Sequence, residues 1–119
     1  GIEILEVTEL KKIILTAIED KKGFDTEEIE VGHLTSIADW FIITEGNSSR
    51  HLKAIADEII SIAKRNKYEI LSVEGRDDLE TGWILIDLGN IIVHIFTEEK
   101  RRRFNLEEFW KTELKKLKR

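Results

Sequence analysis

The stretch TEGNSSR, residues 44–50, holds residue types that could bind a phosphate. It follows a predicted strand and opens a predicted helix, so its backbone N–H groups could surround an anion, with Arg50 adding positive charge. The pattern is neither a Walker loop nor a dinucleotide-binding fingerprint. Capping of the helix by Asn47 or Ser48 explains the same residues, and we favour that simpler interpretation.

The stretch EGRDDLETGW, residues 74–83, gathers carboxylates around one arginine. Its charged residues are Glu74, Arg76, Asp77, Asp78 and Glu80. Paired carboxylates can hold magnesium or act as general acid and base. A charged loop between strands is more often simply a solvated surface, and we favour that interpretation here.

The other reactive residue types form no recognisable site. His33, His51 and His94 lack a ligand spacing such as HxxxH, so a zinc site is not expected. The chain has no cysteine, and no serine lies in a GxSxG turn. These patterns therefore do not require an enzyme, and we expect no cofactor.

Composition fits one domain with an ion-rich surface. The 119 residues are 41% hydrophobic and 36% charged, with a net charge of −5. Residues 100–119 hold nine Lys or Arg and three Glu, a balance of +6, which leaves −11 for residues 1–99. An acidic body favours basic partners. The absence of cysteine, of a signal peptide and of a long apolar run leads us to expect a cytoplasmic protein and no membrane segment.

Apolar periodicity predicts three helices and five strands. Helices are expected from a cap at Thr8 to Gly23, over residues 47–67, and from a cap at Asn105 to the chain end. Strands are expected at 27–34, 39–45 and 68–75, followed by the two arms of a hairpin between residues 83 and 96. The strand–helix–strand unit implies a right-handed parallel crossover and the hairpin an antiparallel pair. We therefore predict a single α/β (α+β) domain over residues 1–119, with a mixed five-stranded sheet and flanking helices.

The hairpin WILIDLGNIIVHIF, residues 83–96, carries polar and aromatic residues among aliphatic ones. A two-residue Gly89-Asn90 turn fixes the register, so that Trp83 opposes Phe96 and Asp87 opposes Ile92. Because side chains alternate between faces, the hairpin has one aliphatic and one mixed face. The aliphatic face is Ile84, Ile86, Leu88, Ile91, Val93 and Ile95, and the mixed face is Trp83, Leu85, Asp87, Ile92, His94 and Phe96.

The aliphatic face suits the amphipathic helices, which leaves the mixed face with two possible roles. Large aromatic residues beside a carboxylate and an imidazole are typical of a binding surface, because aromatic anchors dominate interface energies. Alternatively, the C-terminal helix covers this face, and Trp83 and Phe96 belong to the core. Geometry alone leaves both possibilities open.

Several motifs occur in a fixed order along roughly residues 8–112. They are the ADWFIITEGNSSRHLKAIAD stretch, Glu74-Gly75, the hairpin, the Arg103-Phe104 step and the LEEFW segment at 106–110. Together they resemble the Iojap family, the ribosomal silencing factors (RsfS). Small departures are Leu88 and Asn105, where the family often has Tyr, and Asn90 in place of a common Asp.

The resemblance implies a mixed-sheet domain akin to the nucleotidyltransferase fold but without its catalytic carboxylates. It also implies that the protein is no enzyme. The family is thought to bind ribosomal protein L-fourteen of the large ribosomal subunit and to block subunit joining when nutrients are scarce.

Together, geometry and resemblance predict one partner-binding face. Its residues are Trp83, Leu85, Asp87, His94, Phe96, Arg103 and Phe104, with Trp110 more suited to the core. Three other possibilities stay open: a nucleotidyl or phosphoryl transferase using the GNSSR turn, a homodimer through the mixed face, and a peripheral rRNA contact by the basic segment that begins with residues 100–103.

Overall fold

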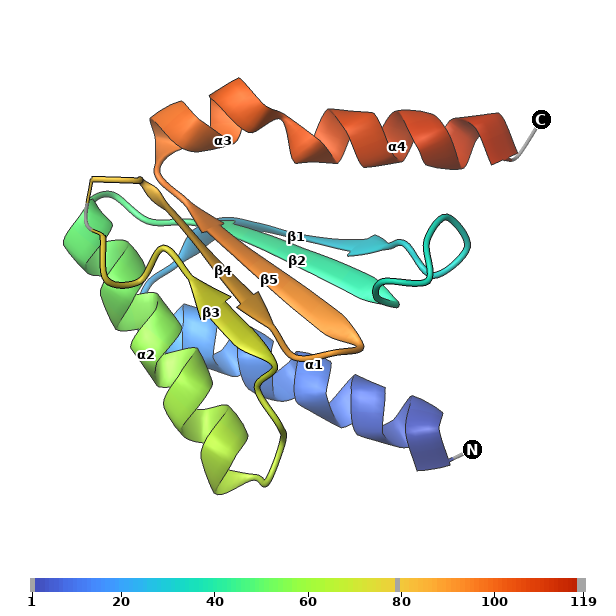
Figure 1. Cartoon of the computed structure of the whole chain (residues 1–119), viewed down its shortest axis with the longest axis horizontal. Coiled ribbons are helices and arrows are strands. Elements are labelled where there is room, and N and C mark those ends of the chain that lie inside the picture. The colour runs from blue at the N-terminus through green and yellow to red at the C-terminus, as the bar shows by residue number, and fades with distance from the viewer. Residues whose placement is uncertain (1, 79, 118–119) are drawn as a thin grey trace.

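The computed structural model describes residues 2–78 and 80–117, without the side chains of residues 2–4, 114, 116 and 117. Its helices are α1 (Ile2–Asp20), α2 (Ser49–Arg65), α3 (Glu98–Phe104) and α4 (Leu106–Leu117) (Figure 1). Its strands are β1 (Phe24–Glu30), β2 (Trp40–Glu45), β3 (Ser72–Glu74), β4 (Trp83–Asp87) and β5 (Ile91–Phe96).

The five strands form one mixed sheet in the order β1-β2-β5-β4-β3. Strands β2 and β5 pair in parallel, and the other three neighbouring pairs are antiparallel. Strands β2 and β3 consequently run in the same direction, as the predicted crossover through α2 requires. The predicted fold class, a single α+β domain with a mixed five-stranded sheet, is confirmed.

The register of the β4–β5 hairpin is also confirmed. Trp83 lies opposite Phe96 and Asp87 opposite Ile92, and Leu88 N–H donates to Ile91 O at 2.9 Å beside the turn. Of the two turn residues only Gly89 has a positive φ, at +89°, which is the φ pattern of a type II′ turn.

Helices α1 and α2 pack on the aliphatic face of the hairpin, while α3 and α4 lie on the opposite side of the sheet (Figure 1). The main core consists of Leu10, Ile14, Ala17, Ile18, Ile42, Leu52, Ile55, Ala56, Ile59, Ala63, Ile84, Ile86, Leu88, Ile91, Val93 and Ile95. Burying each of its larger aliphatic side chains stabilises the fold by about 1.5 to 3 kcal/mol relative to exposure. None of the helices in the described part of the chain is long and apolar enough to span a membrane.

The ends of the first two helices partly follow the predictions. Helix α2 is capped by Ser48, as expected. Helix α1 begins at Ile2, so Thr8 is not its cap but lies inside it. At its end, Lys22 rather than Gly23 takes the left-handed conformation, with φ 62°, and Gly23 N–H donates to Ile18 O at 2.8 Å. Position 23 leaves little room for a side chain, because a Cβ there would lie 2.6 Å from Ile18 Cγ2.

Other boundaries differ from the sequence prediction. Strand β1 spans 24–30 rather than 27–34, because the chain turns at Val31, whose carbonyl accepts from Leu34 N–H. Strand β3 covers three residues instead of the predicted stretch 68–75, since only these pair with β4. Helix α3 was not predicted. Asn105 closes α3 in a left-handed conformation, with φ 48°, instead of acting as an extended N-cap of α4.

Candidate functional site

The GNSSR turn is occupied by contacts within the chain. Ser48 Oγ accepts from His51 N–H at 3.1 Å, which is the capping role expected of it. Asn47 N–H donates to His51 Nδ1 at 3.0 Å, and His51 Nε2 lies 2.6 Å from Lys21 O. Since Nδ1 accepts, Nε2 carries the proton and donates to that carbonyl. The turn therefore links α1 to α2 and has fewer N–H groups left for a phosphate.

The acidic loop after β3 is likewise held by internal contacts. Arg76 pairs with Asp57 of α2 through two bonds, Nε to Oδ1 at 2.5 Å and Nη2 to Oδ2 at 3.2 Å, and its Nη1 meets Asp77 Oδ1 at 2.9 Å. Asp78 Oδ1 accepts from Glu80 N–H at 3.1 Å. Within the described residues, no group of three or more His, Asp or Glu side chains is placed to hold a metal ion.

The mixed face of the hairpin is divided between its two strands. On β4, Trp83, Leu85 and Asp87 are half-buried. On β5, His94 and Phe96 are 6% and 1% exposed. The prediction that His94 and Phe96 belong to a partner-binding surface therefore needs correction, because both side chains are buried. Burial in the core, one of the two alternatives from the sequence, therefore applies to the β5 residues, whereas the β4 residues stay partly accessible.

Helix α4 explains this division, because it covers the β5 side of the face. Trp110 and Leu106 pack against a second core formed by Ile29, Val31, Ala38, Phe41, Ile43, Ile92 and Phe96. The Trp110 ring meets the Phe41 ring edge to face, with centroids 5.3 Å apart, so Trp110 is half-buried as expected of a core residue.

Aromatic rings connect the buried and exposed parts of the face. The His94 ring lies 5.1 Å from that of Phe41, and 6.5 Å from that of Trp83. The Phe104 ring lies 6.0 Å from Trp83 and 5.9 Å from Phe96, and its side chain is 51% exposed. These rings contact one another, so Trp83 and Phe104 pack on a base of buried rings formed by Phe41, His94 and Phe96.

His94 is the least expected component of that base. Burial lowers its pKa to about 4, so the imidazole is neutral at neutral pH. Its two ring nitrogens and Trp83 Nε1 are buried and have no hydrogen-bond partner among the described residues. Burying polar nitrogens without a hydrogen-bond partner lowers the stability of the fold. A well-packed apolar ring at the same position would not have this cost.

We call Trp83, Leu85, Asp87, Arg103 and Phe104 the aromatic face. Arg103 and Phe104 are exposed at the end of α3, and the Phe104 ring lies beside Trp83 of β4. Asp87 also has a structural task, since its Oδ1 accepts from Gly89 N–H at 2.9 Å in the hairpin turn. The structure thus brings five of the seven predicted residues to the surface and places the other two beneath them.

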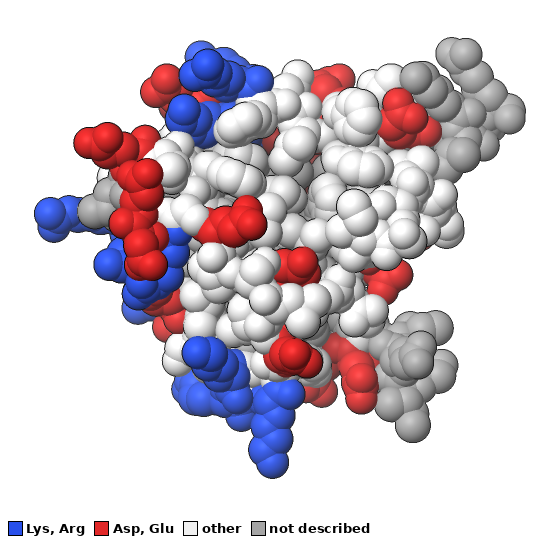
Figure 2. Space-filling model, in the orientation of Figure 1, with Lys and Arg blue, Asp and Glu red and all other residues white. Residues whose placement is uncertain are grey.

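The basic segment is not uniformly available for nucleic acid. Arg101 points inward, and Arg102 pairs with Glu98. Figure 2 shows a largely uncharged face with separate acidic side chains in it, while basic side chains gather at its periphery, including over α3. This charge pattern favours a protein partner over direct nucleic-acid binding.

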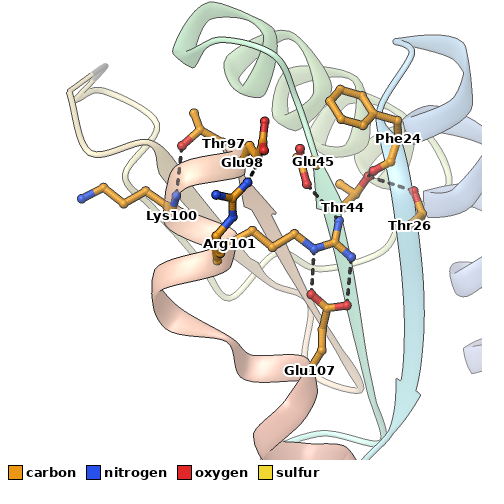
Figure 3. A network of polar contacts seen from close by, with 10 residues as sticks. Phe24, Thr26, Thr44, Glu45, Thr97, Glu98, Lys100, Arg101 and Glu107 are labelled. Atoms are coloured by element: carbon orange, nitrogen blue, oxygen red, sulfur yellow. Dashed lines mark hydrogen bonds and ion pairs between the residues drawn. The ribbon is translucent and has the colours of Figure 1, made fainter.

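An ion-pair network, missed at the sequence level, holds α3 and α4 on the sheet (Figure 3). Arg101 Nε and Nη2 donate to the two carboxylate oxygens of Glu107 at 2.7 and 3.0 Å, and Nη1 lies 3.4 Å from Glu45 Oε1 on β2. The hydrogen bonds from Arg101 lower the pKa of Glu107, whereas burial raises the pKa of Glu45. We call these three residues the clamp.

The sequence analysis also did not assign Phe109 to the surface. Its side chain, on α4, is 57% exposed.

The fold and this surface define a class of protein. It is a small α+β domain whose candidate chemical groups are engaged in internal contacts and whose aromatic face suits binding to another protein. The model of the family described as ribosomal silencing factor during starvation (RsfS) matches residues 5–118. The chain belongs to this family.

Named relatives and a solved structure agree with that assignment. The chain is 37% identical to the ribosomal silencing factor RsfS of Bacillus subtilis over 99 residues, which cover 83% of this chain and 82% of the relative. A crystal structure of a Chromobacterium violaceum protein superposes with a TM-score of 0.82 at 32% identity, covering 87% of this chain and 84% of that one. A mouse protein named mitochondrial assembly of ribosomal large subunit protein 1 is 26% identical, over 82% of this chain and 43% of its own length.

Proposed function

We propose that this protein silences ribosomes by binding ribosomal protein L-fourteen of the large subunit and sterically blocking subunit joining. The observation that carries the proposal is the aromatic face, where Trp83, Leu85 and Phe104 are partly or fully accessible above buried aromatic rings. Trp is among the residues that contribute most to interface energies when they fill a partner's pocket. Membership of the silencing-factor family and the name of the mouse relative support the ribosome as the partner.

The residues of the face have different tasks in this proposal. Trp83, Leu85 and Phe104 contact the partner, while Asp87 pairs with a basic side chain. The net charge of −11 over residues 1–99 attracts a basic protein and speeds its association. His94 and Phe96 act as positioning residues, because they support the Trp83 and Phe104 rings from below.

Silencing of this kind needs occupancy and no catalysis. Tight binding of a compact domain to the intersubunit surface excludes the small subunit wherever their volumes overlap. The alternative, a transferase using the GNSSR turn, is disfavoured because Ser48 and Asn47 are engaged with His51. A transferase would also need carboxylates facing this turn, and the two acidic residues roughly so placed, Asp39 and Asp87, have other contacts. Asp39 accepts from Asn90 Nδ2 at 2.8 Å, and Asp87 holds the hairpin turn.

Co-sedimentation with purified ribosomal subunits tests the proposal. The wild-type protein should pellet with the large subunit and not with the small one. Phe104→Asp, at a position half exposed to solvent, should keep its fold and lose at least about 2 kcal/mol of binding free energy, the size of a hot-spot loss. Phe24→Asp is the matched control, because it makes the same change at an exposed aromatic residue on β1.

Two outcomes would contradict the assignment. Equal binding by wild type and Phe104→Asp would show that another surface docks the subunit. A homodimer buried through the aromatic face would reveal itself in sedimentation of the free protein, as a dimer that Phe104→Asp dissociates and that competes with the subunit.

A further inference from the structure

A groove beside the tip of the β4–β5 hairpin has no part in the proposed function. It is a hollow of about 500 Å³ between the first turns of α1 and the hairpin, lined by Glu6, Val7, Leu10, Tyr68, Glu69, Leu71, Leu88, Gly89 and Asn90. The β4–β5 turn lies next to α1 in Figure 1. We call this hollow the tip groove.

The tip groove combines an apolar floor with an acidic rim. Leu10 and Leu88 are buried at its base, whereas Leu71 is 57% exposed. Glu6 and Glu69 are exposed residues that line the groove, one from α1 and one from the segment before β3. None of the described residues that line it is a lysine or arginine, so its negative charge is not neutralised from within.

Tyr68 adds an aromatic surface to the groove. Its hydroxyl donates to Glu9 Oε1 at 2.8 Å, so a third carboxylate lies close to the rim. Burial, together with the bond to Glu9, raises the pKa of Tyr68 to about 12, and the phenol is neutral at neutral pH. A neutral ring beside carboxylates is a favourable environment for a lysine or arginine side chain.

The neighbouring hollow shows how the chain itself holds a cation in such a setting. That hollow shares Val7 and Asn90 with the tip groove and is lined by Trp40 and Lys11. The Lys11 ammonium lies 3.7 Å from the centre of the Trp40 ring and 3.1 Å from Glu28 Oε1. The tip groove offers the same pair of groups, an aromatic ring and carboxylates, to a cation from outside.

We propose that the tip groove binds a basic peptide segment of a partner protein, in which Lys or Arg residues flank an aliphatic side chain. The aliphatic side chain packs against Leu71 and the buried leucines at the base. The flanking cations pair with Glu6 and Glu69, and one of them reaches the Tyr68 ring. The partner is a protein segment and not a nucleic acid, because the rim would repel phosphate groups.

A titration monitored by NMR tests this on the full chain. The probe is the peptide acetyl-KLKKLK-amide, with acetyl-ELEELE-amide as its matched control. The basic peptide should shift the amide signals of Leu71, Gly89 and Asn90, and the acidic peptide should not. Raising the salt from about 50 mM to about 300 mM should weaken binding, because the charges at the rim are exposed to solvent.

Charge reversal provides the matched variants. Glu6→Lys combined with Glu69→Lys should weaken binding about tenfold or more, since two attractive contacts become repulsive. Glu19→Lys combined with Glu99→Lys changes the net charge equally at exposed sites outside the groove and should bind as wild type does. Phe104→Asp should also leave peptide binding unchanged, which separates this proposal from the one above.

Three outcomes would overturn the proposal. The first is equal shifts with the acidic peptide, and the second is wild-type binding by the groove variant. The third is a dimer of the free protein that the groove variant dissociates, because a second copy of this chain would then be the occupant.

Discussion

Replacing Arg101 with methionine should destabilise the protein at neutral pH. The clamp is largely shielded from water, with side-chain exposures of 12% for Arg101, 9% for Glu45 and 18% for Glu107. Removing one partner of a buried ion pair costs about 3 to 5 kcal/mol, because the other charge stays desolvated and unpaired. Since these carboxylates keep some contact with water, we expect a loss of about 2 to 3 kcal/mol in the free energy of unfolding.

The loss should depend on pH in a defined direction. Glu107 has a lowered pKa, so in the wild type its contribution is present above the unfolded value of 4.5 and disappears as the pH falls through the folded value. Burial raises the pKa of Glu45, and without Arg101 it should rise further. In the variant, protonation removes the unpaired negative charge of both carboxylates. The difference in the free energy of unfolding between wild type and variant should therefore shrink as the pH falls toward 4.5.

Urea unfolding monitored by circular dichroism at pH 7 and pH 5 measures both effects. Arg102→Met is the matched control, because Arg102 pairs with Glu98 on the exposed side of α3 and should change stability by no more than about 0.5 kcal/mol. An Arg101→Met loss no greater than that of the control, or one that is the same at both pH values, would refute the role assigned to the clamp.

Two further predictions concern His94 and the turn glycines. Since burial lowers the pKa of His94 from 6.5 to about 4, the unfolded state binds its proton first, and the wild type should lose about 3 kcal/mol of stability as the pH falls through that interval. His94→Leu should remove this part of the slope in pH-dependent urea unfolding, and an unchanged slope would contradict the burial argument. Gly89→Ala should cost about 1 kcal/mol from its φ of +89° alone, since the nearest atom to its Cβ is Leu71 Cδ1 at 3.8 Å. Gly75→Ala should lower the stability measured by thermal unfolding distinctly more than Gly89→Ala does, because its Cβ would lie 2.2 Å from Trp83 O. Equal losses for the two variants would show that the backbone around Gly75 can shift at little cost in free energy.

Features set by local chemistry could be predicted from the sequence. The two-residue turn at Gly89-Asn90 fixed every pairing of the β4–β5 hairpin, because side-chain alternation leaves no freedom once the turn is placed. The position before an amphipathic run predicted a cap at Asn47 or Ser48, and the structure has it at Ser48. The aliphatic face of the hairpin consequently packs under α1 and α2 as expected.

Features set by tertiary packing could not be predicted in the same way. Helix α3 has no buried residue among those the structure describes, so its segment shows no apolar periodicity. Its local signals were Thr97 as an N-cap, acidic residues in the first turn and arginines in the last turn. The burial of His94 and Phe96 depends on where α4 docks, and that position rests on the clamp between Arg101, Glu45 and Glu107.

The direct test of the central claim is a subunit-joining assay. Purified large and small subunits are mixed in magnesium, and light scattering follows the formation of joined ribosomes with increasing wild-type protein or Phe104→Asp. We predict that the wild type abolishes joining once it saturates the large subunit and that the variant, at the same concentration, does not. Full joining of large subunits that carry the wild-type protein would contradict the account, because the bound protein would then leave the small subunit free to join.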